Sequence, residues 1–207
     1  MAAVRPLTTD EVKKMLKTKA FHTMGNYARN CAILVMQTTM GPRIHELLLL
    51  TVGDVVDRNG NLKESVYFRK TKNSAPRRVY MPPALPPYLI AWLRELENKG
   101  MLISDIPLFV GAYSVKAISR QQVYKIYAAA RKELSIEGIG THSPRKTWAT
   151  ECYNLLSDER ANGARVEPLI ELQKLGGWKK VDSVVHYLSS VSHWGRFIQS
   201  RIFGELK

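Results

Sequence analysis

Helical hydrophobic patterning runs along most of this chain and gives way once, to a β-rich stretch at residues 54–81. The segment GDVVDRNGNLKESVYFRK places β-branched and aromatic residues on both sides of an Asn-Gly turn signal, and PRRVYMP continues the pattern. The pattern predicts a small three-stranded antiparallel sheet. One such sheet among many helices indicates a mostly α fold.

The helices are marked by capping and turn residues. Thr8 and Glu11 form a capping-box pattern that opens a helix ending near Lys19, and Gly41-Pro42 separates a buried helix at 26–39 from one reaching about Thr51. Further helices are expected at 85–98, 118–134, 144–156, 166–175, 180–189 and 193–203. There is no repeat, low-complexity stretch or obvious linker, and we expect one domain over residues 1–207.

The charge of the chain indicates a polyanionic partner. Lys and Arg number 31 against 18 Asp and Glu, a formal net charge of +13, which favours nucleic acid or an anionic membrane surface. The N-terminus has no apolar signal-peptide core, and no apolar run approaches the roughly 20 residues of a membrane helix. These features favour nucleic acid, with a ribosome-like or merely basic protein as the alternative.

The two cysteines, Cys31 and Cys152, are far apart in apolar surroundings. Neither has a second Cys or His at zinc-ligand spacing, so reduced core cysteines are expected and no metal site is. Reduced cysteines suit a cytoplasmic protein.

Two arginines fall at expected helix starts. In HSPR, Ser143 suits an N-cap and Pro144 the first helical position, so His142 and Arg145 flank a helix end that favours an anion such as phosphate. The alternative is a solvated Arg145 beside a cap. Arg43 follows Pro42 at another helix start, with Glu46 in reach to orient it.

The other candidates are a lysine, a tryptophan and a tyrosine. Lys72 lies in a turn between expected strands, where a lysine can reach a leaving group and donate a proton. Trp178 follows Gly176-Gly177, a C-cap signal, and its indole N–H could reach a phosphate oxygen. Tyr187 is on the next helix, and either aromatic side chain could instead serve ordinary packing. Tyr187 is a plausible nucleophile only because the other candidate residues accompany it in the sequence.

Together these segments resemble the catalytic domain of the tyrosine recombinases, the phage integrase family. GPRIHELLLLTVGDV is similar to the first arginine motif, TKNSAPRRVYMP to the lysine hairpin, HSPRKTWAT to the HxxR helix, and LGGWKKVDSVVHY to the block with the nucleophile. The family often has histidine at the place of Trp178, and tryptophan there resembles Cre-like members. The resemblance covers about residues 7–190.

The resemblance implies the chemistry of a site-specific DNA recombinase. Tyr187 would attack a phosphodiester, leaving a 3′-phosphotyrosine and a free 5′-hydroxyl, while Arg43 and Arg145 hold the non-bridging oxygens. Lys72 would protonate the leaving oxygen and His142 would assist. Trp178 would donate its N–H, and Glu46 would orient its neighbours. No metal, ATP or other cofactor is implied, and the remaining candidates for DNA backbone contacts are Lys70, Arg77, Arg78, Lys146 and Lys179.

The family resemblance also carries expectations about assembly. The partner would be double-stranded DNA, with a monomer assembling into a tetramer on DNA, and residues 193–207 would form a C-terminal docking helix. Family members usually carry a helical DNA-clamping domain before the catalytic one, whereas this chain opens with RPLTTDEVKKML, similar to the start of the catalytic domain. We therefore expect that domain to be absent, in a trimmed or naturally short recombinase.

Three other functions fit parts of the pattern. A type IB topoisomerase uses a similar constellation to relax DNA as a monomer. A DNA-binding module without catalysis and a basic structural protein would form no covalent adduct. The complete set of six residues favours the recombinase.

Overall fold

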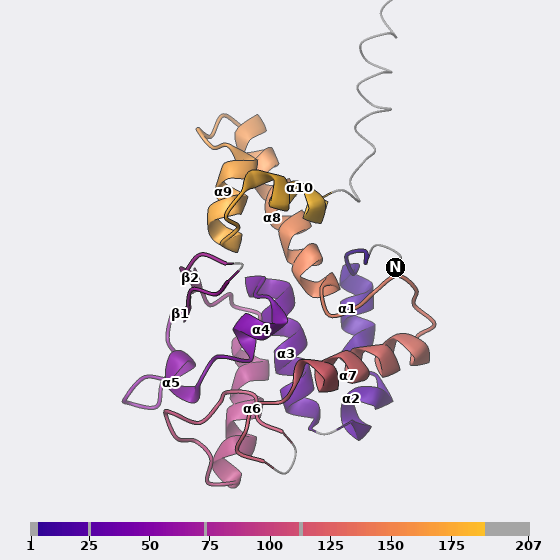
Figure 1. Cartoon of the computed structure of the whole chain (residues 1–207), viewed down its shortest axis with the longest axis vertical. Helices are drawn as coiled ribbons and strands as arrows, with labels where there is room; N and C mark the ends of the chain where they lie inside the picture. Colours follow the sequence, from indigo (N-terminus) through magenta and orange to yellow (C-terminus); the bar gives the residue numbers. More distant parts are fainter. Residues whose placement is uncertain (1–3, 25, 73, 112–113, 189–207) are drawn as a thin grey trace, which may run out of the picture.

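The structure, a computed structural model, describes residues 4–24, 26–72, 74–111 and 114–188 and is mostly helical with one small sheet (Figure 1). Its helices are α1 Thr9–Met15, α2 Lys19–Thr23, α3 Tyr27–Met40, α4 Ile44–Leu47, α5 Val52–Val55, α6 Pro86–Asn98, α7 Arg120–Glu133, α8 Ser143–Ala161, α9 Pro168–Gly176 and α10 Val181–Leu188. Its strands are β1 Ser65–Phe68 and β2 Arg77–Tyr80. The predicted fold class is confirmed, while the predicted helix at 193–203 lies outside the described residues.

The sheet has two strands where the sequence predicted three. β1 and β2 pair antiparallel, with Ser65 opposite Tyr80 and Phe68 opposite Arg77. The segment expected to form the other strand begins instead as the short helix α5, because the Asp54 carboxylate accepts a hydrogen bond from the Thr51 backbone N–H at 2.8 Å and caps the helix start. After α5, Val56 and Leu62 form only an isolated bridge around the Asn-Gly turn.

Two predicted helix starts are also corrected. The helix expected up to Thr51 is α4, a single turn that ends at Leu47, and Arg43 is its N-cap rather than part of its first turn. In α8, His142 is the N-cap and Pro144 the second helical residue. The Ser143 hydroxyl does not cap α8, because it accepts a hydrogen bond from the Gly140 N–H at 3.0 Å.

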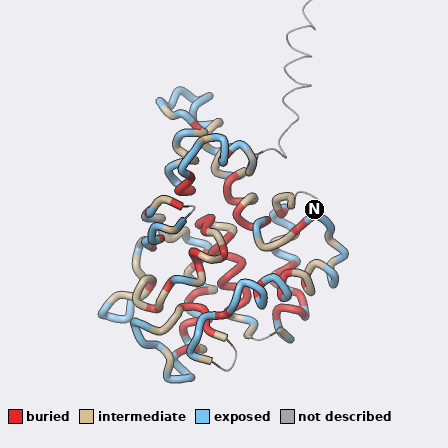
Figure 2. The backbone as a smooth tube through the Cα atoms, in the orientation of Figure 1, coloured by how far each residue is buried: buried red, intermediate tan, exposed pale blue. Residues whose placement is uncertain are grey.

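The core is built around α3, which packs on α6 and α8. Ten of its fourteen residues are buried, and Figure 2 shows this helix as a largely buried segment in the middle of the molecule. A second, smaller cluster lies between α8, α9 and α10 and contains Trp148, Ala149, Leu172, Trp178 and Val184. The large cluster draws on residues 7–139, so the chain from α8 onward has its own small core. None of the described helices is long and apolar enough to cross a membrane.

Candidate active site

Arg145 is the centre of the site and is completely buried. It comes from the first turn of α8, and its guanidinium donates to the backbone carbonyls of Gly41, at the end of α3, and of Gly176, in α9, the latter at 2.7 Å. Burial and the neighbouring charge of Arg43 lower the pKa of Arg145 to about 9, which still leaves it protonated at neutral pH. Three chain segments therefore converge on one buried cation.

Three aromatic rings lie within 6 Å of the Arg145 guanidinium, with Trp178 and Tyr187 nearer to it than Trp148. The Arg145 Cζ lies 4.1 Å from the ring centroid of Trp178 and 5.4 Å from that of Tyr187, within the range of cation–π attraction. The two rings pack edge to face with centroids 5.1 Å apart. The indole N–H of Trp178 is buried and has no hydrogen-bond partner among the described residues. A donor of this kind is costly to leave unpaired, and an incoming acceptor oxygen would satisfy it.

Arg43 also lies near Trp178, with its Cζ 6.0 Å from the ring centroid. Its side chain is 12% exposed and lies 3.5 Å from the carboxylate of Glu46. Burial alone would raise the pKa of Glu46, but hydrogen bonds and charge from Arg77, with hydrogen bonds from Ser74 and Arg43, hold that pKa at about 2. Glu46 is therefore a fixed negative charge that orients the cations around it.

Lys72 and His142 are exposed at the edge of this cluster. Lys72 lies in the turn between β1 and β2, and its backbone carbonyl accepts a hydrogen bond from the Lys179 ammonium at 2.8 Å. The protein packed around His142 and the charges of Arg145 and Arg43 lower the pKa of its imidazole, which favours the neutral form at pH 7. A neutral imidazole can accept a proton, as a general base must.

The structure thus brings Arg43, Arg145, Trp178 and Tyr187 into one cluster, with Lys72 and His142 beside it. The family model described as the phage integrase family matches residues 5–193. The chain belongs to the phage integrase family. The relationship to tyrosine recombinases that the motifs indicated is confirmed, as is the expectation of a family of recombinase enzymes.

Similar proteins are recombinases and integrases. The probable integrase/recombinase YoeC of Bacillus subtilis (strain 168) is 23% identical over 158 residues, covering 76% of this chain and 80% of that protein. The crystal structure of XerA recombinase has a TM-score of 0.67 at 20% identity, and the match covers all of this chain and 66% of the XerA chain. A XerH site-specific recombinase bound to difH substrate has a TM-score of 0.63 at 21% identity, and the match covers 93% of this chain and 54% of the XerH chain. The chain therefore spans about half to two thirds of the solved structures it matches.

The cations predicted to contact the DNA backbone divide into two groups in this integrase-family structure. Lys70, Arg78 and Lys179 are exposed and Lys146 is half-buried. Arg77 is a correction, because it is 7% exposed and its guanidinium makes two hydrogen bonds to Glu46, at 3.1 and 2.9 Å. The antiparallel register explains this, since Arg77 faces the buried Phe68 across the sheet.

Sequence reasoning missed Ser74, which is buried between Arg43 and Glu46. No local signal in KTKNSAPRR separates this serine from a solvated turn residue. Its contacts depend on α4 and the hairpin lying against each other, which the sequence alone does not show.

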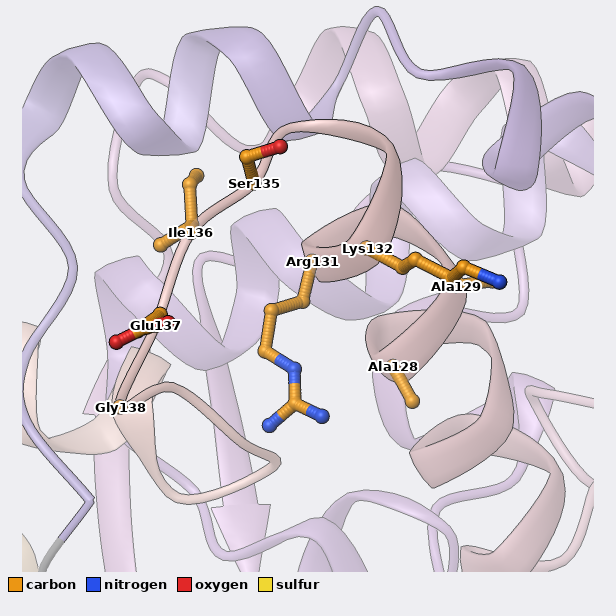
Figure 3. A pocket seen from close by; sticks show the side chains of 8 residues that line it. All are labelled: Ala128, Ala129, Arg131, Lys132, Ser135, Ile136, Glu137 and Gly138. Atoms are coloured by element: carbon orange, nitrogen blue, oxygen red, sulfur yellow. The ribbon is translucent and has the colours of Figure 1, made fainter.

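An open cavity of about 880 Å³ lies elsewhere in the integrase-family fold, at the C-terminal end of α7 (Figure 3). It is lined by Ala128, Ala129, Arg131, Lys132, Ser135, Ile136, Glu137 and Gly138. None of these residues belongs to the Arg145 cluster, and the cavity is not part of the candidate site.

Proposed function

We propose that this chain is the catalytic part of a site-specific recombinase that cleaves and rejoins double-stranded DNA through a 3′-phosphotyrosine. The observation that carries the proposal is the position of Tyr187 beside the Arg145 guanidinium and the Trp178 indole, in a chain of the phage integrase family. A tyrosine against a buried cation and an unpaired N–H donor is suited to meeting a phosphate there.

In the proposed reaction the Tyr187 oxygen attacks the phosphorus and the bond to the 5′-oxygen breaks. The phenol proton passes to His142 or water, and Lys72 gives a proton to the departing 5′-oxygen. The product is a phosphotyrosine at the 3′ end and a free 5′-hydroxyl. Attack on the phosphotyrosine by that hydroxyl restores the original strand, and attack by the 5′-hydroxyl of another strand forms a new phosphodiester. Both release Tyr187 and conserve the bond energy, so rejoining requires no ATP.

Fixed cations would stabilise the charge that develops at phosphorus. Arg43 and Arg145 both lie near Trp178, and guanidinium groups suit the non-bridging oxygens because they donate in a fork. Groups held in place before the reaction stabilise the transition state without reorganising during it. We therefore propose that cleavage proceeds without a divalent metal.

Engagement of Arg145 requires a local rearrangement. Its two terminal nitrogens donate to the Gly41 and Gly176 carbonyls, and its Nε lacks a partner among the described residues. A phosphate is a stronger acceptor than a carbonyl because it carries charge. The proposal is that DNA binding draws this guanidinium from its backbone carbonyls toward the scissile phosphate.

The proposed partners follow from the family and the charge. The surface cations would bind the DNA backbone, and working complexes would be tetramers passing through a Holliday junction. The C-terminal docking helix at 193–207 and a DNA-associated cytoplasmic location stay predictions.

The test is adduct formation on nicked suicide DNA taken from the genomic neighbourhood of the gene. The wild-type chain should give a protein–DNA adduct on a denaturing gel, in excess EDTA as well as in Mg²⁺. Tyr187→Phe should give none while binding DNA with nearly unchanged affinity, because only one oxygen is lost. A full adduct yield from the Phe variant would reject Tyr187 as the nucleophile, and a requirement for Mg²⁺ would reject the metal-free mechanism.

The same assay separates the alternative functions. Relaxation of supercoiled plasmids with no sequence requirement would instead indicate a type IB topoisomerase activity. DNA binding with no adduct on any such substrate would indicate a binding module that lacks catalysis.

A further inference from the structure

Lys72, the proposed general acid, lies in a turn that is closed by two backbone hydrogen bonds. Thr71 N–H donates to the Ser74 carbonyl at 3.1 Å, and Ser74 N–H donates to the Thr71 carbonyl at 3.4 Å. Lys72 lies inside this four-residue turn and its side chain is exposed, whereas Ser74 at the end of the turn is fully buried. The position of the Lys72 backbone is therefore set by how Ser74 is held.

The Ser74 hydroxyl is held from two sides by charged groups. It accepts a hydrogen bond from Arg43 Nη1 at 2.5 Å, and it donates one to the Glu46 carboxylate. A hydroxyl has a single proton and two acceptor lone pairs, so donation to the carboxylate leaves the lone pairs for the guanidinium. One small side chain thus joins the arginine of α4 to the turn that carries Lys72.

Glu46 is itself fixed independently of Ser74. Its carboxylate pairs with the buried Arg77 guanidinium, and it accepts a hydrogen bond from the Arg43 backbone N–H at 2.7 Å. Two further contacts secure the turn, from His45 Nε2 to Thr71 Oγ1 at 3.4 Å and from Ala75 N–H to the Gly177 carbonyl at 3.0 Å. Removal of the Ser74 hydroxyl would therefore loosen the turn at one point without dismantling the buried ion pair.

We propose that Ser74 is a positioning residue of the strand-cleavage reaction, fixing the Lys72 turn relative to Arg43. The inference rests on the proposed function, because it assigns a role within that reaction. Arg43 would hold the non-bridging oxygen while Lys72 reaches the leaving oxygen of the same phosphate, so the separation of their backbones decides whether both can act at once. Lysine has four flexible side-chain bonds, and a fixed turn reduces the freedom that would otherwise be lost on binding.

The test compares two suicide DNA substrates in single-turnover cleavage by the full chain. One has the ordinary 5′-bridging oxygen, and the other has sulfur there, which leaves as a thiolate and needs no proton. Ser74→Ala should slow cleavage of the oxygen substrate by about 10–100-fold, the order expected for misplacing a catalytic group by about 1 Å. Its rate on the sulfur substrate should return to near that of the wild type.

Two companion variants keep the comparison decisive. Ser65→Ala removes another hairpin hydroxyl, one that accepts a hydrogen bond from the exposed Arg78 at 3.1 Å, and it should cleave both substrates like the wild type. Ser74→Cys preserves the shape of the side chain with a weaker donor, and it should show the same selective defect in smaller measure. Circular dichroism identifies any variant that fails to fold. If Ser74→Ala does not fold, the rates of Ser74→Cys on the two substrates provide the comparison.

Three results would overturn the positioning role. They are wild-type rates for both Ser74 variants on the oxygen substrate, equal defects on both substrates, and an equal selective defect in Ser65→Ala. Failure of the proposed function looks different, because the wild-type chain would then form no adduct with either substrate.

Discussion

Arg145 carries its charge where no solvent reaches it. A buried cation is costly unless other groups replace water, and here two backbone carbonyls and the faces of Trp178 and Tyr187 do so. None of these partners is an anion in hydrogen-bond contact, since the nearest Glu46 oxygen is 3.9 Å away. The cation is therefore incompletely neutralised, which suits its proposed role of binding a phosphate.

Glu46 is the residue whose loss should cost the fold most within this cluster. Glu46→Gln would leave Arg77 buried without its counter-charge, and breaking a buried pair typically costs about 3–5 kcal/mol of unfolding free energy. Urea denaturation at pH 7 measures this loss. Glu171→Gln, which removes an exposed pair with Lys174, should change stability by less than about 1 kcal/mol.

The same prediction has a pH signature. The folded-state pKa of Glu46 is about 2, below the ordinary value of 4.5, so its charge stabilises the fold above pH 4.5. That contribution is lost as the pH falls from 4.5 toward 2. The stability difference between wild type and Glu46→Gln should therefore shrink over that interval, and a difference independent of pH would contradict the assigned ion pair.

At the scale of elements, the long helices could be predicted and the short ones could not. α6 and α7 each sustain a hydrophobic period over at least 13 residues, which identifies a helix without tertiary information. α3 is buried on nearly all sides, and its length identifies it as a helix. α4 and α5 are four residues each, and β-branched residues at 52–56 favour a strand on propensity alone. The cap by Asp54 decided the outcome, and such a contact outweighs propensity over so short a segment.

The candidate site was likewise predictable only in part. The residues that gather around Arg145 could be predicted because their motifs are contiguous in sequence, as in HSPR. The burial of Arg77 could not, because its partner Glu46 is 31 residues away. The strand register, which the structure supplies, explains the burial: Arg77 stands opposite the buried Phe68 and so lies on the buried face of the hairpin.

Gly41, at the end of α3, gives a separate prediction because both its backbone conformation and its close neighbour limit substitution. Its φ is +68°, and an added Cβ would lie 2.2 Å from the Trp148 ring. Gly60 also has a positive φ, +83°, but open space around it. Gly60→Ala should cost about 1–2 kcal/mol for the left-handed backbone, whereas Gly41→Ala should cost clearly more and should also displace the carbonyl that holds Arg145. Equal decreases in Tm for the two variants would show that the Trp148 ring moves aside without cost.

At the scale of the whole molecule, the proposed nucleophile and its proposed electrostatic partners belong to different cores. Arg43 directly precedes Ile44, and Lys72 is in the hairpin of Phe68, both members of the large cluster that draws on residues 7–139. Trp178 and Tyr187 instead pack in the small cluster of α8, α9 and α10. In Figure 1 these last helices lie together at one end of the described chain. Arg145 bridges the two through Gly41 and Gly176. Motion of one core relative to the other would therefore change the site directly.

We predict that the small cluster opens before the large one. Opening free energies vary across a structure with the amount of buried apolar contact, and among the described residues five side chains form the buried part of the small cluster. Native-state hydrogen exchange should show α9 amides exchanging through an opening of lower free energy than that of α3. Leu172→Ala, in the small cluster, should lower protection in α9 and leave α3 unchanged.

Leu89→Ala provides the opposite perturbation, because Leu89 is completely buried in the large cluster. Truncation of a buried leucine typically costs about 2–5 kcal/mol, so protection in α3 should fall by that amount. Protection in α9 should not change as long as its own opening remains the easier one. If each variant instead lowers protection equally in α3 and α9, the two clusters unfold as one unit. Separate responses would mean that the Arg145 contact to Gly176 can break while the large core stays folded, which is the freedom that the proposed binding of a phosphate by this guanidinium requires.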